Sequence, residues 1–246
     1  MGQACTDFSA QGRHSGGCVV TSPSSAGSPR THSTPSAVRS AGPPHTWEAL
    51  GVLQQEGVAE SRKGAGVFVR EFRPVRRRGI DRLSARRWGA GGSIWEADAV
   101  ERDLDVDRLS VGHTTSPESV ARVLELPAAA EVCVRSRRYV LDGKPVLATS
   151  YLSAELLAGT AITREDTGPG GVYARLAEIG HRPAHFREEV RSRMPSQDEA
   201  ERLGLSPGTP VILIHRTAFT ADGRAVELNE MTLDAAAYVL EYDFDA

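Results

Sequence analysis

"ARVLELPAAAEVCVRSRRYVLDGKPV" (121–146) and "AERLGLSPGTPVILIHRTAFTADGRAV" (200–226) resemble each other along their whole length. Each reads as the end of a helix, a strand, an Asp-Gly turn and a return strand, because Asp-Gly between apolar runs is a strong hairpin signal. Leu124 aligns with Leu203 and Arg137 aligns with Arg216, at an offset of about 79 residues. The second unit has one extra residue before its Asp-Gly. Two such units predict one antiparallel sheet with approximate twofold symmetry and a ligand cleft near its centre. The alternative is that the two stretches are not a repeat and share a helix–hairpin pattern by convergence.

The residues around these units complete an α+β domain from about 108 to the C-terminus. Ser196 and Glu199 have the spacing of a capping box at the start of a helix. Pro117 suits the first position of another helix, and Gly180 suits the end of a third. The predicted helices are "SPESVARVLEL" (116–126), "GGVYARLAEIG" (170–180) and "SQDEAERLGL" (196–205), and "HFREEVRSRM" (185–194) is a predicted strand.

The N-terminal part of the chain has a different composition. Residues 1–45 are rich in Ser, Pro and Gly, so they bury too little apolar surface to offset ordering entropy, and we expect a disordered tail. From Thr46, "TWEALGVLQQEG" predicts a helix with Trp47, Leu50 and Leu53 on one face. "VAES" and "GVFVRE" then predict two strands joined by the turn "RKGAG" (62–66).

An arginine-rich stretch separates this unit from the α+β domain. Residues 72–107 carry about seven arginines between Arg73 and Arg87, followed by several glycines, which predicts a basic linker without a packed element. Its charge favours a position near a polyanion, although a solvated linker without a partner is the alternative. The predicted organisation is therefore a tail (1–45), a helix and hairpin (46–71), a basic linker (72–107) and an α+β domain (108–246).

Composition excludes several classes of protein. The net charge is −3, and no apolar run approaches the roughly 20 residues that span a bilayer. The N-terminus lacks the apolar core of a signal peptide, and three cysteines are too few for a disulfide scaffold, so we expect the cytoplasm of a cell. Cys5, His14 and Cys18 fit no common zinc spacing, and we expect no metal and no cofactor.

Catalytic motifs are missing from the sequence. "GAG" (64–66) is not a phosphate loop, because no G-x-G-x-x-G pattern is present and a strand rather than a helix follows it. No G-x-S-x-G stretch occurs, and His113, His181, His185 and His215 are scattered. Glu188, with other carboxylates, shows no paired spacing, so the sequence gives no support to an enzyme.

The best candidate chemistry is a pair of arginines. Arg135 and Arg137 are two apart on a predicted strand, so both side chains point to the same face of the sheet. Two guanidinium groups in a cleft would recognise a carboxylate or phosphate. The alternative, which we weigh equally, is that both face solvent.

"TWEALGVLQQEGVAESRKGAGVFVRE" (46–71) resembles the end of the winged helix-turn-helix of GntR-type bacterial transcription regulators, with "RKGAGVFVRE" as the wing. From about Arg108, the chain resembles the UTRA effector domain of the HutC branch of that family. The matching stretches include the Arg135 strand, "DGKPVLATSYL", "GGVYARLAE", "DEAERLGL" and "DGRAVELNE". The resemblance implies a chorismate lyase-like fold used as a sensor rather than an enzyme. It also implies a homodimer in the bacterial nucleoid that binds an operator palindrome and responds to a small-molecule effector.

The resemblance also implies the site residues. The implied DNA contacts are Thr46, Arg62, Lys63, Gly64 and Gly66. The implied effector-binding residues are Arg135, Arg137, Ser150, Tyr173, Glu227 and Tyr238. An anionic metabolite is one candidate effector, but Gly170 and Gly171 replace the serine that sugar-phosphate-binding members often carry, which argues against a phosphate.

One departure from the family concerns DNA binding. Members carry a complete helix-turn-helix pattern upstream of the recognition helix, whereas residues 1–45 show none of it. Our hypothesis is that this stretch is an out-of-frame or misassigned start, which would leave a wing but most of the DNA-reading helix missing. Two other functions stay open: a stand-alone small-molecule-binding domain without DNA binding, and a lyase-type enzyme that uses the same cleft.

Overall fold

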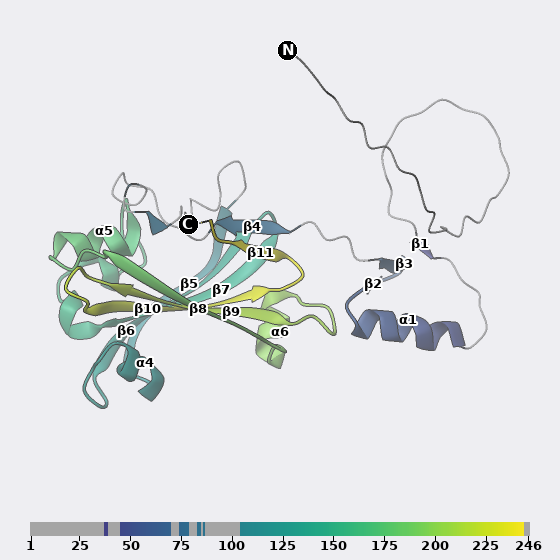
Figure 1. Ribbon diagram of the computed structural model, residues 1–246, viewed down its shortest axis with the longest axis horizontal. Helices are drawn as coiled ribbons and strands as arrows, with labels where there is room; N and C mark the ends of the chain where they lie inside the picture. Colours follow the sequence, from purple (N-terminus) through teal and green to yellow (C-terminus); the bar gives the residue numbers. More distant parts are fainter. Residues whose placement is uncertain are drawn as a thin grey trace, which may run out of the picture. The chain divides into compact units, whose positions relative to one another are not determined.

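A six-stranded antiparallel sheet dominates the described part of the protein (Figure 1). The computed structural model describes residues 37–38, 45–69, 74–78, 83–84, 86 and 104–243. The strands lie in the order β5-β6-β7-β10-β9-β8. Their bounds are β5 Leu104–Thr115, β6 Glu131–Leu141, β7 Lys144–Ser153, β8 His185–Arg193, β9 Val211–Phe219 and β10 Ala225–Asp234. The predicted α+β class with a central antiparallel sheet is confirmed.

The two repeated units of the sequence form the two halves of this sheet. Hairpins β6–β7 and β9–β10 meet at the centre, where β7 pairs with β10. Each half adds an outer strand, β5 or β8, and a helix, α4 (Glu118–Val123) or α6 (Gln197–Leu203). Asp142 and Gly143 both have positive φ, as a tight two-residue hairpin turn requires. The sheet therefore has the approximate twofold order that the repeat predicts.

The two faces of the sheet have different covers, because alternate residues of each strand point to opposite sides. Helices α4 and α6 pack on one face, where Leu124 and Leu203 join two separate apolar clusters (Figure 1). On the other face, one end carries helix α5 (Gly171–Glu178) and the 3-10 helices η1 (Ala154–Leu157) and η2 (Ala161–Thr163). Strands β4 (Val75–Arg78) and β11 (Tyr238–Glu241) cover its other end.

The residues that occupy equivalent positions in the two halves of the sheet differ from those that the sequence repeat aligns. At the centre, Ser150 of β7 faces Asn229 of β10. Arg135 is the neighbour of Ser150 on β6, and Arg216 is the neighbour of Asn229 on β9. In the sheet, Arg216 is thus the counterpart of Arg135, although the sequence pattern matched it with Arg137.

The reason lies in the second hairpin. Two residues separate the paired ends of β6 and β7, whereas residues 220–224 separate Phe219 from its partner Ala225. A bulge between Ala225 and Glu227 leaves one further residue unpaired. Compared with the pairing of β6 with β7, the pairing of β9 with β10 is therefore shifted by two residues from what the sequence repeat suggests. A shift of two residues gives Arg216 a different partner but keeps its side chain on the same face.

Strand β4 corrects the prediction that 72–107 has no packed element. It pairs in parallel with β11, and the Val75 amide donates to the Ala237 carbonyl at 2.7 Å. Val75 and Arg77 are buried, and the latter's Nη1 lies 3.7 Å from the Met231 sulfur. The prediction failed because only one of the four residues of this short strand is apolar and its partner lies far along the chain.

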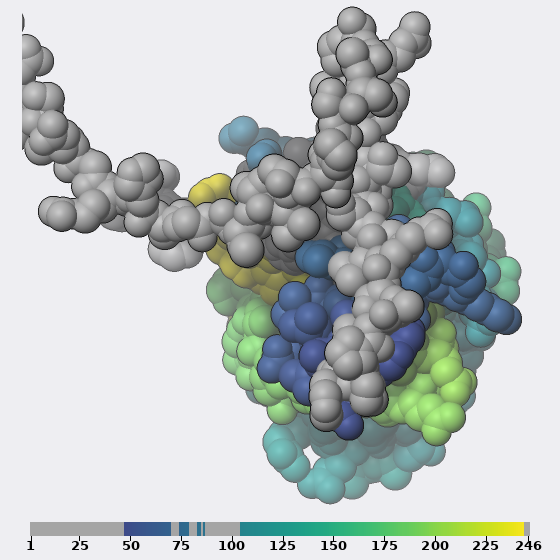
Figure 2. Space-filling model, turned by 90° about the vertical axis from the view of Figure 1, so that its right-hand side faces the viewer, coloured from purple at the N-terminus to yellow at the C-terminus, as the bar shows by residue number. Residues whose placement is uncertain are grey.

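The helix and hairpin at the front of the described chain have the predicted form. Helix α1 (His45–Gln55) precedes β2 (Ala59–Arg62) and β3 (Gly66–Val69), which pair antiparallel. Figure 2 draws α1 and the hairpin in shades of dark blue. Trp47 is 65% exposed and Leu53 is 38% exposed, so the apolar face of α1 is largely uncovered.

The predicted disordered tail lies almost wholly outside the described residues. Ala37–Val38 form the short strand β1, which pairs with β3. For the rest of this stretch, disorder stays a prediction.

The capping box of α6 is confirmed and gives a pH-dependent prediction. Ser196 accepts from the Glu199 amide, and the carboxylate of Glu199 accepts from the Ser196 amide at 2.8 Å. Two hydrogen bonds of 2.7 Å from Arg193, with the Ser196 contacts, lower the pKa of Glu199 to about 2. The unfolded carboxylate binds its proton at higher pH, so this stabilisation is complete above about pH 5 and is lost as the pH falls towards 2.

Glu199→Gln should therefore cost about 1 kcal/mol of unfolding free energy at pH 7 and flatten the fall in stability below pH 5. Urea denaturation at several pH values measures both effects, with Glu189→Gln on the exposed surface of β8 as the control. Parallel pH profiles for wild type and Glu199→Gln would show that the Arg193–Glu199 contact contributes nothing.

Candidate functional site

A row of polar side chains crosses the middle of the sheet on the face that carries α5, β4 and β11. Strand pairing places its members next to one another across five strands. In order from β6 to β8, the polar row consists of Arg135, Ser150, Asn229, Arg216 and Glu188. Apolar clusters lie on both sides of it, with Cys133 and Leu152 towards α5 and Tyr139 and Met231 towards β11.

The polar row is buried although it carries charge. Arg135, Ser150, Asn229 and Arg216 are each at most 2% exposed. Asn229 Nδ2 donates to Ser150 Oγ at 2.8 Å, which joins the two halves of the sheet at its centre. Burying charged groups in an apolar setting is costly unless partners compensate them, so the contacts of each arginine decide what the row can do.

Arg135 anchors the segment that leads from η2 to α5. Its Nη1 donates to the carbonyls of Ile162 and Arg164, and its Nη2 donates to the Glu165 carbonyl at 2.9 Å. Burial and the neighbouring Arg137 charge lower the pKa of Arg135 to about 10, so it stays protonated at neutral pH. Its Nε has no hydrogen-bond partner among the described residues.

Arg216 lies below α5. Its guanidinium carbon is 5.9 Å from the centre of the Tyr173 ring, which in turn packs 5.3 Å from the Phe186 ring. Burial by itself lowers the pKa of Arg216, but Tyr173, Glu227 and Glu188 together raise it above the ordinary value. Within the described chain, Nε and Nη1 of Arg216 find no acceptor.

Two buried acceptors lie on β10, the strand that pairs with the strand of Arg216. Glu227 lies two residues before Asn229 on β10 and is 3% exposed. Neither Glu227 Oε2 nor Asn229 Oδ1 meets a donor in the described residues. An unsatisfied buried group costs about 1–3 kcal/mol, so a polar ligand that satisfied several of them would bind here favourably.

The structure brings together most of the predicted effector-binding residues. Arg135 and Ser150 belong to the polar row, and Tyr173 and Glu227 adjoin it. Arg135 is fully buried, so the alternative that it faces solvent fails. Arg137, two residues further along β6, points to the same face and is half-buried.

Tyr238 lies elsewhere. It belongs to the apolar cluster beside β4, and its hydroxyl donates to the Lys144 carbonyl at 2.7 Å. Lys144 is six residues from Ser150 along β7, or roughly 20 Å at the rise of a strand. Sequence reasoning, in contrast, did not select Arg216 and Asn229, although the repeat matched Arg216 with an arginine of the first unit.

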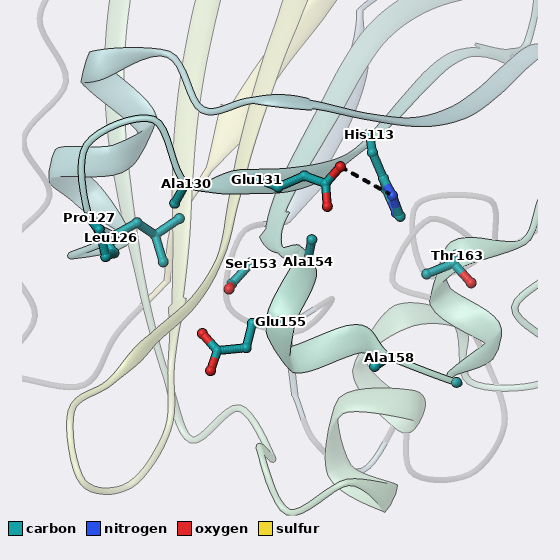
Figure 3. A pocket seen from close by; sticks show the side chains of 11 residues that line it. His113, Leu126, Pro127, Ala130, Glu131, Ser153, Ala154, Glu155, Ala158 and Thr163 are labelled. Atoms are coloured by element: carbon teal, nitrogen blue, oxygen red, sulfur yellow. Dashed lines mark ion pairs between the residues drawn. The ribbon is translucent and has the colours of Figure 1, made fainter.

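A separate open pocket of about 590 Å³ lies beside the ends of β6 and β7 (Figure 3). His113 and Glu131 face each other there, with Nδ1 and Oε1 3.9 Å apart. Their side chains are 43% and 64% exposed, so water solvates both groups without a ligand. None of the predicted effector-binding residues lines this pocket, and we therefore place the candidate site at the polar row.

The hairpin carries the predicted DNA contacts. Arg62 ends β2, where it pairs with Glu60 at 2.7 Å and stacks 4.8 Å from the Phe68 ring centre. Lys63 is exposed in the turn. Gly64 and Gly66 have φ of +75° and +118°, which favour glycine. Thr46 lies in α1, and a role in DNA contact stays a prediction for all five residues.

Comparison with known proteins decides the family. A model of the UTRA domain matches residues 101–239. An HTH-type transcriptional regulator of Streptomyces coelicolor is 33% identical over 205 residues, which cover 80% of this chain and 76% of that protein. The chain belongs to the UTRA-domain branch of the GntR-type transcriptional regulators.

Further relatives agree with this assignment. An HTH-type transcriptional regulator of Mycobacterium tuberculosis is 30% identical to this GntR-type chain over 192 residues, which cover 73% of the chain and 64% of that protein. The crystal structure of a GntR-family transcriptional regulator matches with a TM-score of 0.63 and 25% identity, over 81% of both chains. PhnF from Mycobacterium smegmatis matches in fold, with a TM-score of 0.56 and 23% identity over 82% of this chain and 84% of its own.

Other classes of site find no support in the described part of this UTRA-domain protein. Its His, Cys, Asp and Glu side chains form no group of three or more that could hold a metal ion. Cys5, His14 and Cys18 lie outside the described residues. No helix in the described ranges is long and apolar enough to cross a membrane.

Tyr238→Phe tests whether this residue is structural. Losing the hydrogen bond to the Lys144 carbonyl should lower the unfolding free energy by about 1 kcal/mol and leave ligand affinity unchanged. Denaturant titration and thermal shift with a binding ligand measure the two effects. A large loss of affinity at unchanged stability would return Tyr238 to the site.

Arg135→Lys tests the anchoring of the segment after η2. A lysine cannot reach three carbonyls at once, so the amides of residues 162–165 should exchange with deuterium at least tenfold faster, with a stability loss on the order of 2 kcal/mol. Arg137→Lys on the same strand is the matched control. Unchanged exchange in Arg135→Lys would show that these contacts do not hold the segment.

Proposed function

We propose that the protein is a transcriptional regulator whose C-terminal domain binds a small-molecule effector at the polar row and thereby modulates binding of operator DNA. The carrying observation is the set of buried polar atoms on Arg216, Glu227 and Asn229 that have no hydrogen-bond partner among the described residues. Groups of this kind weaken a core that serves only as a scaffold, whereas they are useful where a ligand completes their hydrogen bonds.

Strand β4 offers a route from the effector to the DNA-binding unit. Met231 follows Asn229 by two residues on β10 and contacts Arg77. Arg77 belongs to β4, which follows the hairpin after only a few residues. Arg76 and Arg78 on either side bind Glu241 at 3.0 and 3.2 Å, so β4 is fixed to β11. A ligand that moves Asn229 would change the packing of the strand that leads to the wing.

The proposal includes a homodimer, in keeping with a palindromic operator, and excludes catalysis. The polar row presents two arginines, the Glu188 carboxylate, the Asn229 amide and the Ser150 hydroxyl. In the described residues this hydroxyl accepts from the Asn229 amide, which is not a base. A second candidate is a binding domain that does not act on DNA. The exposed apolar face of α1 favours it, because a complete helix-turn-helix would bury Trp47 and its neighbours.

DNA binding separates the two candidates. We expect this chain to bind the DNA upstream of its gene weakly, at micromolar concentrations or above, with an affinity that falls as salt rises. Lys63→Ala should reduce the slope of log affinity against log salt by about 0.9, the loss of one phosphate contact. Fluorescence anisotropy between 50 and 200 mM salt measures this, with Lys144→Ala in the effector domain as the control. An affinity that depends on neither salt nor Lys63 would favour the second candidate.

A further inference from the structure

We propose that the polar row recognises a small carboxylate that carries a hydroxyl or ammonium group on the neighbouring carbon, and that Arg216, Glu227 and Asn229 make the specific contacts. This inference rests on the proposed effector site and adds the chemical class of the ligand. Amino acids and 2-hydroxy acids share this chemistry.

The polar atoms without partners among the described residues indicate which hydrogen-bonding groups a ligand must carry. Arg216 offers two N–H donors, on Nε and Nη1, to an anionic group. Glu227 Oε2 and Asn229 Oδ1 offer two acceptors, which require a donor on the ligand. All three side chains are at most 3% exposed, so bulk water does not satisfy these atoms from outside. The ligand must therefore present an acceptor and a donor close together.

Strand geometry fixes how close they are. Arg216 and Asn229 are directly paired on β9 and β10, about 5 Å apart, and Glu227 is one step further along the same face of β10. An anion on Arg216 and a donor within reach of Asn229 and Glu227 are then separated by only a few ångströms. Adjacent carbons of one small molecule span that distance.

Charge decides between a carboxylate and a phosphate ester. A dianionic phosphate at Arg216 would lie beside the Glu227 carboxylate, and like charges at this distance repel strongly when buried. A carboxylate on Arg216 with a donor on Glu227 instead alternates the charges.

Arg135 has a different part in this arrangement. Its two Nη groups already hold the carbonyls of residues 162, 164 and 165, and only its Nε is without a partner. Arg135 therefore forms the edge of the proposed site on the β6 side and holds the segment of residues 162–165 in place. The discrimination between ligands lies on the β9–β10 side.

The test is a thermal-shift and calorimetry screen of the full chain with three sets of probes. The first set is the twenty amino acids with lactate, malate and gluconate, which carry the adjacent donor. The second is propionate and succinate, which lack it. The third is glucose 6-phosphate and glycerol 3-phosphate. We expect binding from the first set only, and the split between amino and hydroxy acids identifies the source of the donor.

Two variants assign the contacts. Arg216→Lys keeps the charge but offers one point of contact, and should weaken the best first-set ligand by roughly tenfold or more. Glu227→Gln should weaken an ammonium-bearing ligand by at least as much, and a hydroxy acid less. Arg191→Lys, exposed on β8, is the matched control for Arg216→Lys.

A double variant guards against a purely structural explanation. Arg216→Met with Glu227→Leu removes both buried charges, so the free protein should melt at or above the wild-type temperature and lose all ligand response. A sharp drop in its melting temperature would show that the two residues hold the fold and would overturn the proposal.

The outcomes also separate this proposal from the function it rests on. Binding of a phosphate ester, or of propionate as tightly as lactate, would overturn the ligand class while leaving an effector site in place. Absence of binding by all three sets, together with an unchanged DNA affinity in their presence, would count against both.

Discussion

The burial of two arginines in the middle of an antiparallel sheet is the constraint on which the rest of the effector domain depends. A guanidinium cannot be deprotonated at neutral pH, so each must find acceptors or lie near compensating charge. Arg135 meets this demand with backbone carbonyls from η2 and the residues after it, which ties a covering segment to the sheet. Arg216 meets it in part with Tyr173 and with the charges of Glu227 and Glu188. The difference between them separates a structural arginine from one with donors left for a ligand.

Local signals predicted most of the fold. Asp142-Gly143 and Asp222-Gly223 located both hairpins, and Ser196 with Glu199 located the start of α6, because turns and caps are decided by residues close in sequence. Strand β4 escaped prediction, since a four-residue strand made mostly of arginines resembles a linker until its distant partner is known. The bulge after Ala225 likewise has no signature in the chain.

The site was predicted only in part, for a related reason. Arg135 was predicted from its spacing on a strand, and Ser150, Tyr173 and Glu227 from resemblance to a family; the four lie together in the structure. Arg216 and Asn229 depend on the register between β9 and β10, which the turn and the bulge set jointly. Tyr238 packs beside β4 and donates to the Lys144 carbonyl, so it lies outside the row and its role in the site stays a prediction. Residue types indicate which groups can bind an anion, but register decides which of them meet.

The second hairpin imposes a parity rule on any change of length. Five connecting residues and one bulged residue stand where the first hairpin has two, an even difference that preserves which side chains point inward. A shift of one residue in the pairing of β9 would turn Arg216 to the opposite face and bring His215 or Thr217 into the row. A change of length in this hairpin therefore preserves the row only where the loop or a bulge takes up an odd residue.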